Sequence, residues 1–355
     1  MPGIDRYLQI LLDQGGSDLH LSAGRPPLLR VHGSLEPMEL EDDLRPEVVL
    51  KLMDEIVPAH MKGGDPMADL DFAYQLGPKA RFRVNFFRQH RGGGAVLRII
   101  PTKIPTIAEL GLPTSVERFA KLRHGLVLVT GPTGSGKSTT LASIINQINL
   151  DRAAHILTIE DPVEFVHENK KSLITQREIG PHAPSFAGAL RVAIRQDPDV
   201  ILVGEMRDLE TVSLALTAAE TGALVFGTLH TNSAAKTVDR MIDVFPQAEQ
   251  EMARSLLASS LKGILAQQLV KTADGQGRVC ALEIAVCSYG VANLIREGKT
   301  FQLASVIQSG KAEGMQTLEQ ALAELVEKKK ITKEAAYATA INKEYVATLL
   351  GIPPE

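Results

Sequence analysis

The 355-residue chain has no tryptophan and only two cysteines, and aromatic residues make up 4% of it. Two cysteines are too few for the disulfide framework of a small secreted protein. The apolar runs are strand-sized, well short of the about 20 residues that span a bilayer. The first residues, MPGIDRYLQILLDQGGSD, lack the basic region and cleavage site of a secretory signal. These absences predict a cytoplasmic protein.

A surplus of positive charge is also missing, because 38 Lys and Arg face 42 Asp and Glu and the net charge is −4. No overall basic field favours binding to nucleic acid. The 44% of hydrophobic residues is enough for ordinary packed cores, and the length suggests two domains.

The most informative stretch is GLVLVTGPTGSGKSTT at residues 125–140. Its G-x-x-x-x-G-K-[ST] pattern is typical of a phosphate-binding P-loop, here between an apolar strand-like run and residues at helical spacing. Glycines let backbone N–H groups approach phosphate oxygens, Lys137 can reach the β- and γ-phosphates, and the Ser138 hydroxyl is a hard-oxygen ligand for Mg²⁺. The sequence therefore predicts a site for ATP and Mg²⁺ made by Gly131, Pro132, Thr133, Gly134, Ser135, Gly136, Lys137, Ser138 and Thr139.

The apolar pattern changes along the chain. Residues 1–100 combine a first helix with alternating segments and many Gly- and Pro-containing turns, which predicts a small α+β domain. Residues 101–114 contain three prolines and are expected to be a linker. In residues 115–355, strand-like runs at 126–130, 155–160, 200–204 and 223–229 alternate with helical stretches. That order is typical of an α/β domain with a parallel sheet, and an apolar stripe predicts one helix over 247–270.

Polar groups follow three of these predicted strands. Glu160 and Glu164 lie at and just after the end of 155–160, Glu205 follows 200–204, and His230 follows 223–229. Because ligands of an open parallel sheet bind beyond the carboxyl ends of its strands, we expect one joint active site.

Phosphoryl-transfer chemistry suggests roles for these residues. Glu205 is expected to hold Mg²⁺ through a water, although Gly204 stands where a Walker-B Asp is usual. Glu164 or Glu160 can polarise the attacking water, with Glu160 also counted among the nucleotide-binding residues. Neutral His230 can sense the γ-phosphate by a hydrogen bond.

Together the segments GPTGSGKSTT, TIEDPVEF, LRVAIRQDPDVILVGEMRD, ETGALVFGTLHTNSA and QQLV resemble the type II/IV secretion ATPase superfamily. SDLHLSAGRPPLLRVHG and RFRVNFF extend the resemblance to the N-terminal domain, and it is strongest to retraction ATPases of type IV pili. The resemblance implies a RecA-like P-loop NTPase domain after a PAS-like domain, and a homo-hexameric ring. It also implies an inner-membrane platform protein as partner and a place on the cytoplasmic side of that membrane.

The resemblance further implies that arginines of the N-terminal domain reach the nucleotide phosphates. The matching residues are Arg81, Arg83 and Arg98. Strand alternation places Arg81 and Arg83 on one face, and a guanidinium fork suits phosphate oxygens.

Assembly and secretion ATPases of the superfamily usually carry a longer N-terminal region and a four-cysteine zinc motif. Cys280 and Cys287 lack the paired C-x-x-C spacing of a structural zinc site, so we expect no zinc and favour retraction. Residues 290–297, GVANLIRE, match the retraction signature AIRNLIRE only in their last five positions. A main retraction motor and a divergent paralogue both remain open.

Three alternatives compete with a retraction motor. The first is a pilus-assembly or type II secretion ATPase. The second is a nucleic-acid translocase, which the acidic balance disfavours. The third is a nucleotide switch without hydrolysis, which Lys137, Ser138, Glu164 and Glu205 disfavour. The sequence thus predicts a Mg²⁺-dependent ATPase motor that powers pilus retraction and twitching motility without nucleic acid.

Overall fold

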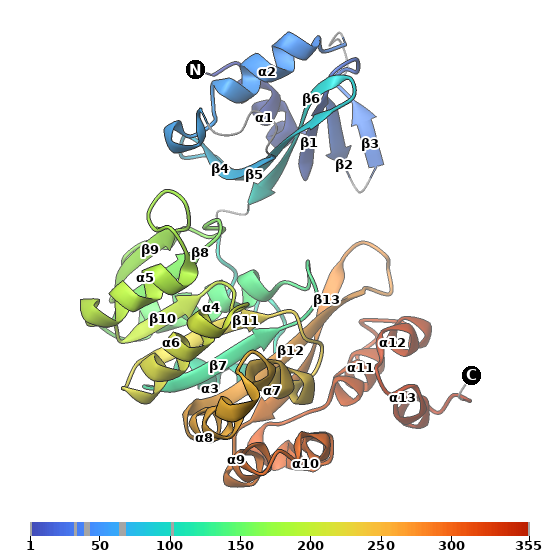
Figure 1. Cartoon of the computed structure of the whole chain (residues 1–355). Helices are drawn as coiled ribbons and strands as arrows, with labels where there is room; N and C mark the ends of the chain where they lie inside the picture. Colours follow the sequence, from blue (N-terminus) through green and yellow to red (C-terminus); the bar gives the residue numbers. More distant parts are fainter. Residues whose placement is uncertain (1, 32–33, 39–42, 64–68, 101–102, 354–355) are drawn as a thin grey trace. The chain divides into compact units, whose positions relative to one another are not determined.

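A computed structural model of the chain describes residues 2–31, 34–38, 43–63, 69–100 and 103–353. The chain divides into two units. The first comprises residues 1–103 together with 162–166, and the second comprises residues 104–161 and 167–355. Figure 1 shows the elements of both units.

The first unit is built on a six-stranded antiparallel sheet in the order β3-β2-β1-β6-β5-β4. Helices α1 (Ile4–Asp13) and α2 (Pro46–Asp54) pack against it (Figure 1). Apolar side chains at every second strand position, such as Leu19, Val84 and Leu97, are fully buried with α1 and α2 in one core. This is the α+β arrangement predicted for the N-terminal domain. The strands are β1 (Asp18–Ser22), β2 (Leu28–Val31), β3 (Ser34–Pro37), β4 (Leu70–Leu76), β5 (Ala80–Gln89) and β6 (Gly92–Ile100).

The second unit contains a seven-stranded sheet in the order β13-β12-β7-β11-β10-β8-β9. All neighbouring pairs are parallel except β12 and β13. The four strands predicted from apolar runs are confirmed as β7, β8, β10 and β11. The strands are β7 (Gly125–Thr130), β8 (His155–Glu160), β9 (Leu173–Glu178), β10 (Val200–Val203), β11 (Leu224–Leu229), β12 (Leu261–Lys271) and β13 (Arg278–Val286).

Helices cover both faces of this sheet, as right-handed crossovers between parallel strands require. Helices α5, α6, α7 and α8 lie on one face and α4 lies on the other (Figure 1). The helices are α3 (Glu117–Ala120), α4 (Lys137–Asp151), α5 (Phe186–Ala193), α6 (Leu209–Glu220), α7 (Ala234–Asp243) and α8 (Gln250–Ser260). This is the α/β architecture predicted from the alternating pattern.

The C-terminal part is helical. Helices α11 to α13 pack with Val270 of β12 and Ala281 of β13 in a small second core, which includes Leu318 and Val346. The helices are α9 (Tyr289–Arg296), α10 (Leu303–Ser309), α11 (Leu318–Glu327), α12 (Lys333–Thr339) and α13 (Lys343–Leu350). Short 3₁₀ turns lie at Ala59–Met61, Thr114–Val116, Ile194–Gln196, Gln247–Glu249, Thr300–Gln302 and Gly310–Glu313.

The single helix predicted over 247–270 is wrong in its second half. Helix α8 ends at Ser260, and Leu261–Lys271 form strand β12 between β7 and β13. Most of β12 is buried on both faces, so its apolar residues form a nearly continuous run that also fits a helical spacing.

The predicted linker at 101–114 differs from the structure in its extent. Residues 101–102 lie outside the described residues, and residues 104–114 belong to the second unit. Ile107 and Leu112 are buried in that unit's core, because apolar side chains between the prolines pack against it.

Candidate nucleotide-binding and catalytic site

The loop at residues 131–136 connects β7 to α4 and has the backbone of a phosphate cradle. Gly131, Gly134 and Gly136 have φ values of +145°, +77° and +86°, a region that side chains disfavour. A Cβ on Gly131 would lie 2.3 Å from the carbonyl oxygen of Gln267. The loop therefore needs glycine at position 131, where β12 and Ser135 pack closely against it.

The N-terminus of α4 fits an anion. Its capping residue, Gly136, supplies no side-chain acceptor, whereas Ser185, Asp208 and Ser233 cap α5, α6 and α7. The first N–H groups of α4 are thus left to a ligand. Lys137 Nζ donates to the carbonyl oxygens of Gly131 at 2.9 Å and Pro132 at 3.2 Å, which keeps the ammonium group at the loop.

Gln267 on β12 holds the same loop from the neighbouring strand. Its Nε2 donates to the Ser135 carbonyl oxygen at 2.5 Å, and the side chain is buried. Gln267 lies in the QQLV segment, which carries part of the family resemblance, but the sequence predicts no role for it. The predicted helix over 247–270 hides its place on a strand beside the P-loop.

Backbone hydrogen bonds join the carboxyl ends of β8, β10 and β11. The Gly204 N–H donates to the Ile159 carbonyl at 2.7 Å, and the Met206 N–H donates to the Thr228 carbonyl at 3.0 Å. A Cβ on Gly204 would lie 3.0 Å from the Ile159 oxygen. This close approach favours glycine at the usual place of the Walker-B Asp, and the acid Glu205 stands one residue later.

Glu205 and His230 meet at these strand ends. His230 Nε2 lies 3.0 Å from Glu205 Oε1, and the Arg207 guanidinium bonds to the same oxygen. A pocket of about 140 Å³ lies among them, lined also by Thr231 and Arg240. The structure thus brings together two predicted residues and adds two arginines. Arg207 stands in the GEMRD run, which was the available signal for it.

Glu160 and Glu164 lie in different settings. Glu160 Oε1 accepts hydrogen bonds from Thr158 Oγ1 at 2.6 Å and from Gln176 Nε2 at 3.1 Å. Glu164 belongs to the segment 162–166, which groups with the first unit, and its Oε1 lies 3.8 Å from Arg83 Nη1.

The three predicted arginines lie on adjacent strands of the first unit. Arg83 on β5 is directly opposite Arg98 on β6, and Arg98 is opposite Asp18 on β1. These residues therefore share one face of the sheet, and Arg81 joins them by alternation.

Each of two arginines is paired with an aspartate. Arg98 Nε donates to Asp18 Oδ1 at 2.7 Å, and Arg83 makes a two-pronged pair with Asp71. Burial by itself would raise the pKa of Asp18, but the hydrogen bonds from Ser17 and Arg98 outweigh it and hold the pKa below its ordinary value. Asp18 therefore stays charged and pairs with Arg98.

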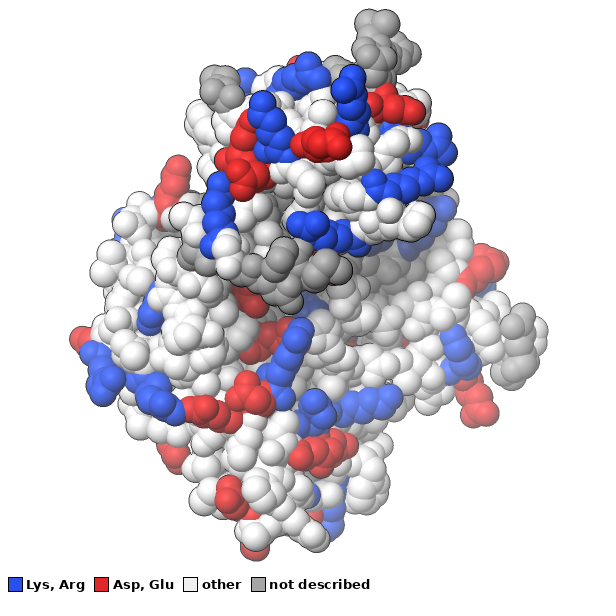
Figure 2. Space-filling model, turned by 45° about the horizontal axis from the view of Figure 1, so that its top comes forward, with Lys and Arg blue, Asp and Glu red and all other residues white. Residues whose placement is uncertain are grey.

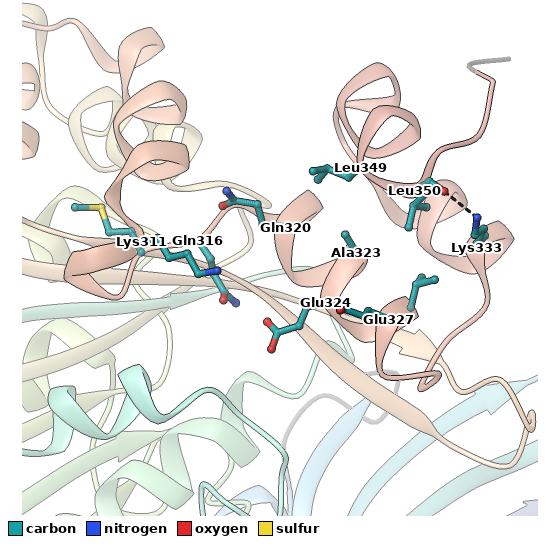
Figure 3. Close-up of a pocket in the computed structure, with 11 residues that line it drawn as sticks. Lys311, Gln316, Gln320, Ala323, Glu324, Glu327, Lys333, Leu349 and Leu350 are labelled. Carbon is teal, nitrogen blue, oxygen red and sulfur yellow. Dashed lines mark hydrogen bonds between the residues drawn. The ribbon is translucent and has the colours of Figure 1, made fainter.

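Other features lie away from this site. Burial raises the pKa of Cys287 to about 11, which keeps that thiol protonated and a poor metal ligand. A cavity of about 580 Å³ lies among the C-terminal helices, where Glu324 and Glu327 of α11 and Lys333 of α12 line it (Figure 3). It contains none of the predicted nucleotide-binding residues. On the face shown in Figure 2, basic and acidic side chains are interspersed.

A glycine-rich loop on a strand–helix junction, beside strand ends that carry Glu205 and His230, defines a RecA-like P-loop ATPase. Residues 67–348 match the family described as type II/IV secretion system protein. The chain therefore belongs to this family, and the resemblance predicted from the motifs is confirmed.

Individual relatives give more detail. The chain is 51% identical over 333 residues to the type IV pilus retraction ATPase PilT of Pseudomonas aeruginosa, which covers 94% of this chain and 96% of that protein. It is 39% identical over 354 residues to the type IV pilus ATPase PilU of the same organism, covering 99% and 92%. A crystal structure of the pilus retraction motor PilT with bound ADP matches with a TM-score of 0.89 and 44% identity, covering 96% of this chain and 98% of that one. Among the helices described, none is both long and apolar enough to cross a membrane.

Proposed function

We propose that the chain is a type IV pilus retraction ATPase, which hydrolyses ATP to remove subunits from the base of the pilus. The observation that carries the proposal is the 51% identity to a pilus retraction ATPase over 94% of the chain, with an intact P-loop. Identity to PilU is lower, at 39%, which favours the retraction ATPase over that paralogue.

Magnesium is part of the proposal. The Ser138 hydroxyl and the Glu205 carboxylate are the hard oxygen donors that Mg²⁺ accepts, and they stand at the start of α4 and the end of β10. When bound with ATP, Mg²⁺ would neutralise charge on the β- and γ-phosphate oxygens. Glu205 would then exchange its bonds to His230 and Arg207 for the hydration shell of the metal.

The remaining groups act on water and phosphate. Glu164 or Glu160 accepts a proton from the attacking water. His230, no longer bonded to Glu205, donates to a γ-phosphate oxygen, while Lys137 moves from the loop carbonyls to the phosphates. Arg81, Arg83 and Arg98 stabilise the charge that develops on the transferring group.

We further propose that the chain acts as a homo-hexamer on the cytoplasmic side of the inner membrane, against a platform protein of the pilus machinery. Membership of the type II/IV secretion family and identity to pilus motors support this arrangement. A head-to-tail contact between subunits closes into such a ring when the rotation permits.

Steady-state phosphate release by the purified protein tests the site. Lys137→Ala should abolish hydrolysis, since it removes the charge that faces the phosphates. Glu164→Gln and Glu205→Gln should still bind ATP but hydrolyse it at least about 10²-fold more slowly. Glu210→Gln is the matched control, because Glu210 is an exposed acid paired with Arg191 on the surface. Wild-type turnover in the Lys137 variant would contradict the P-loop assignment, and stimulation by DNA would favour a translocase.

A further inference from the structure

The helix that follows His230 is held at its first residue by a buried carboxylate from another strand. Glu283 on β13 is 9% exposed, and its Oε1 accepts a hydrogen bond from the Ala234 N–H at 2.6 Å. Ala234 is the first residue of α7. A helix N-terminus favours a negative partner, so this bond holds the start of α7 together with the Ser233 side chain, which accepts a hydrogen bond from the Lys236 N–H.

The position of Glu283 in the sheet connects it with the P-loop strand. Glu283 is opposite Ala266 on β12, and Ala266 is opposite Thr130, the last residue of β7. Glu283 therefore lies in register with the end of β7, where the chain enters the phosphate loop, and its carboxylate binds the first residue of α7 from there.

The segment between His230 and α7 is short and fixed at both ends. His230 contacts Glu205 at 3.0 Å, and Ala234 is bound by Glu283 four residues later. Thr237, one turn into α7, has its hydroxyl 2.7 Å from that of Thr231. A shift of the α7 start would therefore move the His230 segment with it.

We propose that Glu283 is a positioning residue for ATP hydrolysis, which holds the start of α7 so that His230 is aligned with Glu205 and the γ-phosphate. This inference rests on the proposed roles of His230 and Glu205. In this proposed role, Glu283 contacts neither the nucleotide nor the metal ion. It acts only through the segment that carries His230.

Glu319 offers a matched comparison within the same chain. It is 6% exposed, lies on α11, and accepts hydrogen bonds from the backbone N–H groups of Ile341 and Asn342 at 3.1 and 2.9 Å. It thereby holds the start of α13 as Glu283 holds the start of α7. Removing Glu283 leaves the buried Ala234 N–H without this acceptor, and removing Glu319 does the same to the partly buried N–H groups of Ile341 and Asn342. Each loss costs stability, but the bond to Glu283 holds the helix that follows His230, whereas the bonds to Glu319 hold the start of α13.

The test measures kcat and KM for ATP hydrolysis in the full-length protein. Glu283→Ala should lower kcat by roughly 10- to 100-fold, the scale of a misplaced catalytic group, with KM changed less than about twofold. Glu283→Gln keeps an oxygen acceptor and should restore kcat to within about threefold of wild type. Glu319→Ala removes a charge that helps to raise the pKa of Glu283, but it leaves the hydrogen bond from the Ala234 N–H to Glu283 in place and should leave kcat near the wild-type value. Thermal unfolding of each variant identifies losses that are due to misfolding. If Glu283→Ala does not fold, Glu283→Gln still tests the inference, because a much larger loss of kcat than threefold in the folded Glu283→Gln protein would contradict the role given to the oxygen acceptor.

A double-mutant cycle separates positioning from general stability. If Glu283 acts through His230, Glu283→Ala should lower kcat no further once His230→Ala is present. An equal loss in both backgrounds, or a loss as large in Glu319→Ala, would overturn the inference while leaving the role of His230 intact. Wild-type kcat in His230→Ala alone would instead overturn the proposed site, and the role of Glu283 with it.

Discussion

At the residue scale, most candidate catalytic groups already have a protein partner. Glu205 is bonded to His230 and Arg207, and Arg98 is bonded to Asp18, a residue 80 positions away in the chain. The motifs predicted the candidate residues, because P-loop and strand-end patterns are local in the sequence. They did not predict these partners, since sheet register decides which distant side chains meet.

The pair of Arg98 and Asp18 allows a test of the arginine's role. Arg98→Ala removes a charge proposed to face phosphate, and should lower hydrolysis by roughly 10³-fold or more if it acts as arginine fingers do. Asp18→Asn removes the same ion pair but keeps Arg98, and should hydrolyse ATP within about threefold of wild type. Phosphate-release rates give the comparison, and equal losses in both variants would show that the pair is only structural.

Glu283 should make folding stability depend on pH. Burial, with Glu319 as a smaller cause, raises the pKa of Glu283 to about 7, although the Ala234 N–H bond acts in the opposite direction. The unfolded chain releases this proton near pH 4, so the folded state binds it more tightly and the contribution to stability is complete below about pH 4. It should be lost as the pH rises to about 7.

Urea unfolding of wild type and Glu283→Gln between pH 4 and 8 measures this contribution. The free energy of unfolding of wild type relative to the variant should fall by up to about 3 kcal/mol and then level off. A difference that is constant over this range would contradict the raised pKa.

At the element scale, short apolar runs between helical stretches predicted strands correctly. The long apolar stripe over 247–270, which fits both a helix and a buried strand, did not predict its second half correctly. The strands β7, β8, β10 and β11 are short apolar runs with helical stretches between them, and the structure contains all four. Strand β12 follows helix α8 without a break, so its apolar residues extended the predicted helix. Gln267 lies on β12, and its contact with the P-loop was missed for the same reason.

Gly263 is where the close packing of β12 is most sensitive to substitution. A Cβ there would lie 2.3 Å from the Phe119 ring and 2.9 Å from the Ala285 carbonyl oxygen. Gly263→Ala should therefore lower the free energy of unfolding by roughly 1–3 kcal/mol. Gly277→Ala, in the turn after β12, meets nothing nearer than 3.8 Å and is the control. Denaturant unfolding of the two variants should separate them, and equal stability would contradict the packing described for β12.

At the scale of the whole molecule, length predicted two domains and the sequence pattern placed the first at residues 1–100, close to the unit of residues 1–103. The start of the second domain was placed too late. Three prolines suggested a linker over 101–114, yet Ile107 and Leu112 pack into the core of the second unit. Assembly into a ring came only from the family resemblance, because pairing between subunits leaves no periodic trace in one chain.

The proposed ring leads to a prediction on mass. Light scattering of the purified protein with Mg²⁺ and ATP should give six times the mass of one chain, since a head-to-tail contact that closes has a fixed number of subunits. The Lys137→Ala variant tests whether the nucleotide contributes to assembly. Monomers alone, with and without Mg²⁺ and ATP, would contradict the hexamer.

The central claim is that ATP hydrolysis at this site powers pilus retraction. It is tested most directly by imaging labelled pili in cells that lack the chain and carry either wild type or Glu205→Gln at equal abundance. Wild type should restore retraction, whereas the variant should leave pili extended because it binds ATP without turning it over. Normal retraction driven by Glu205→Gln in cells, with hydrolysis absent in the purified variant, would contradict the account.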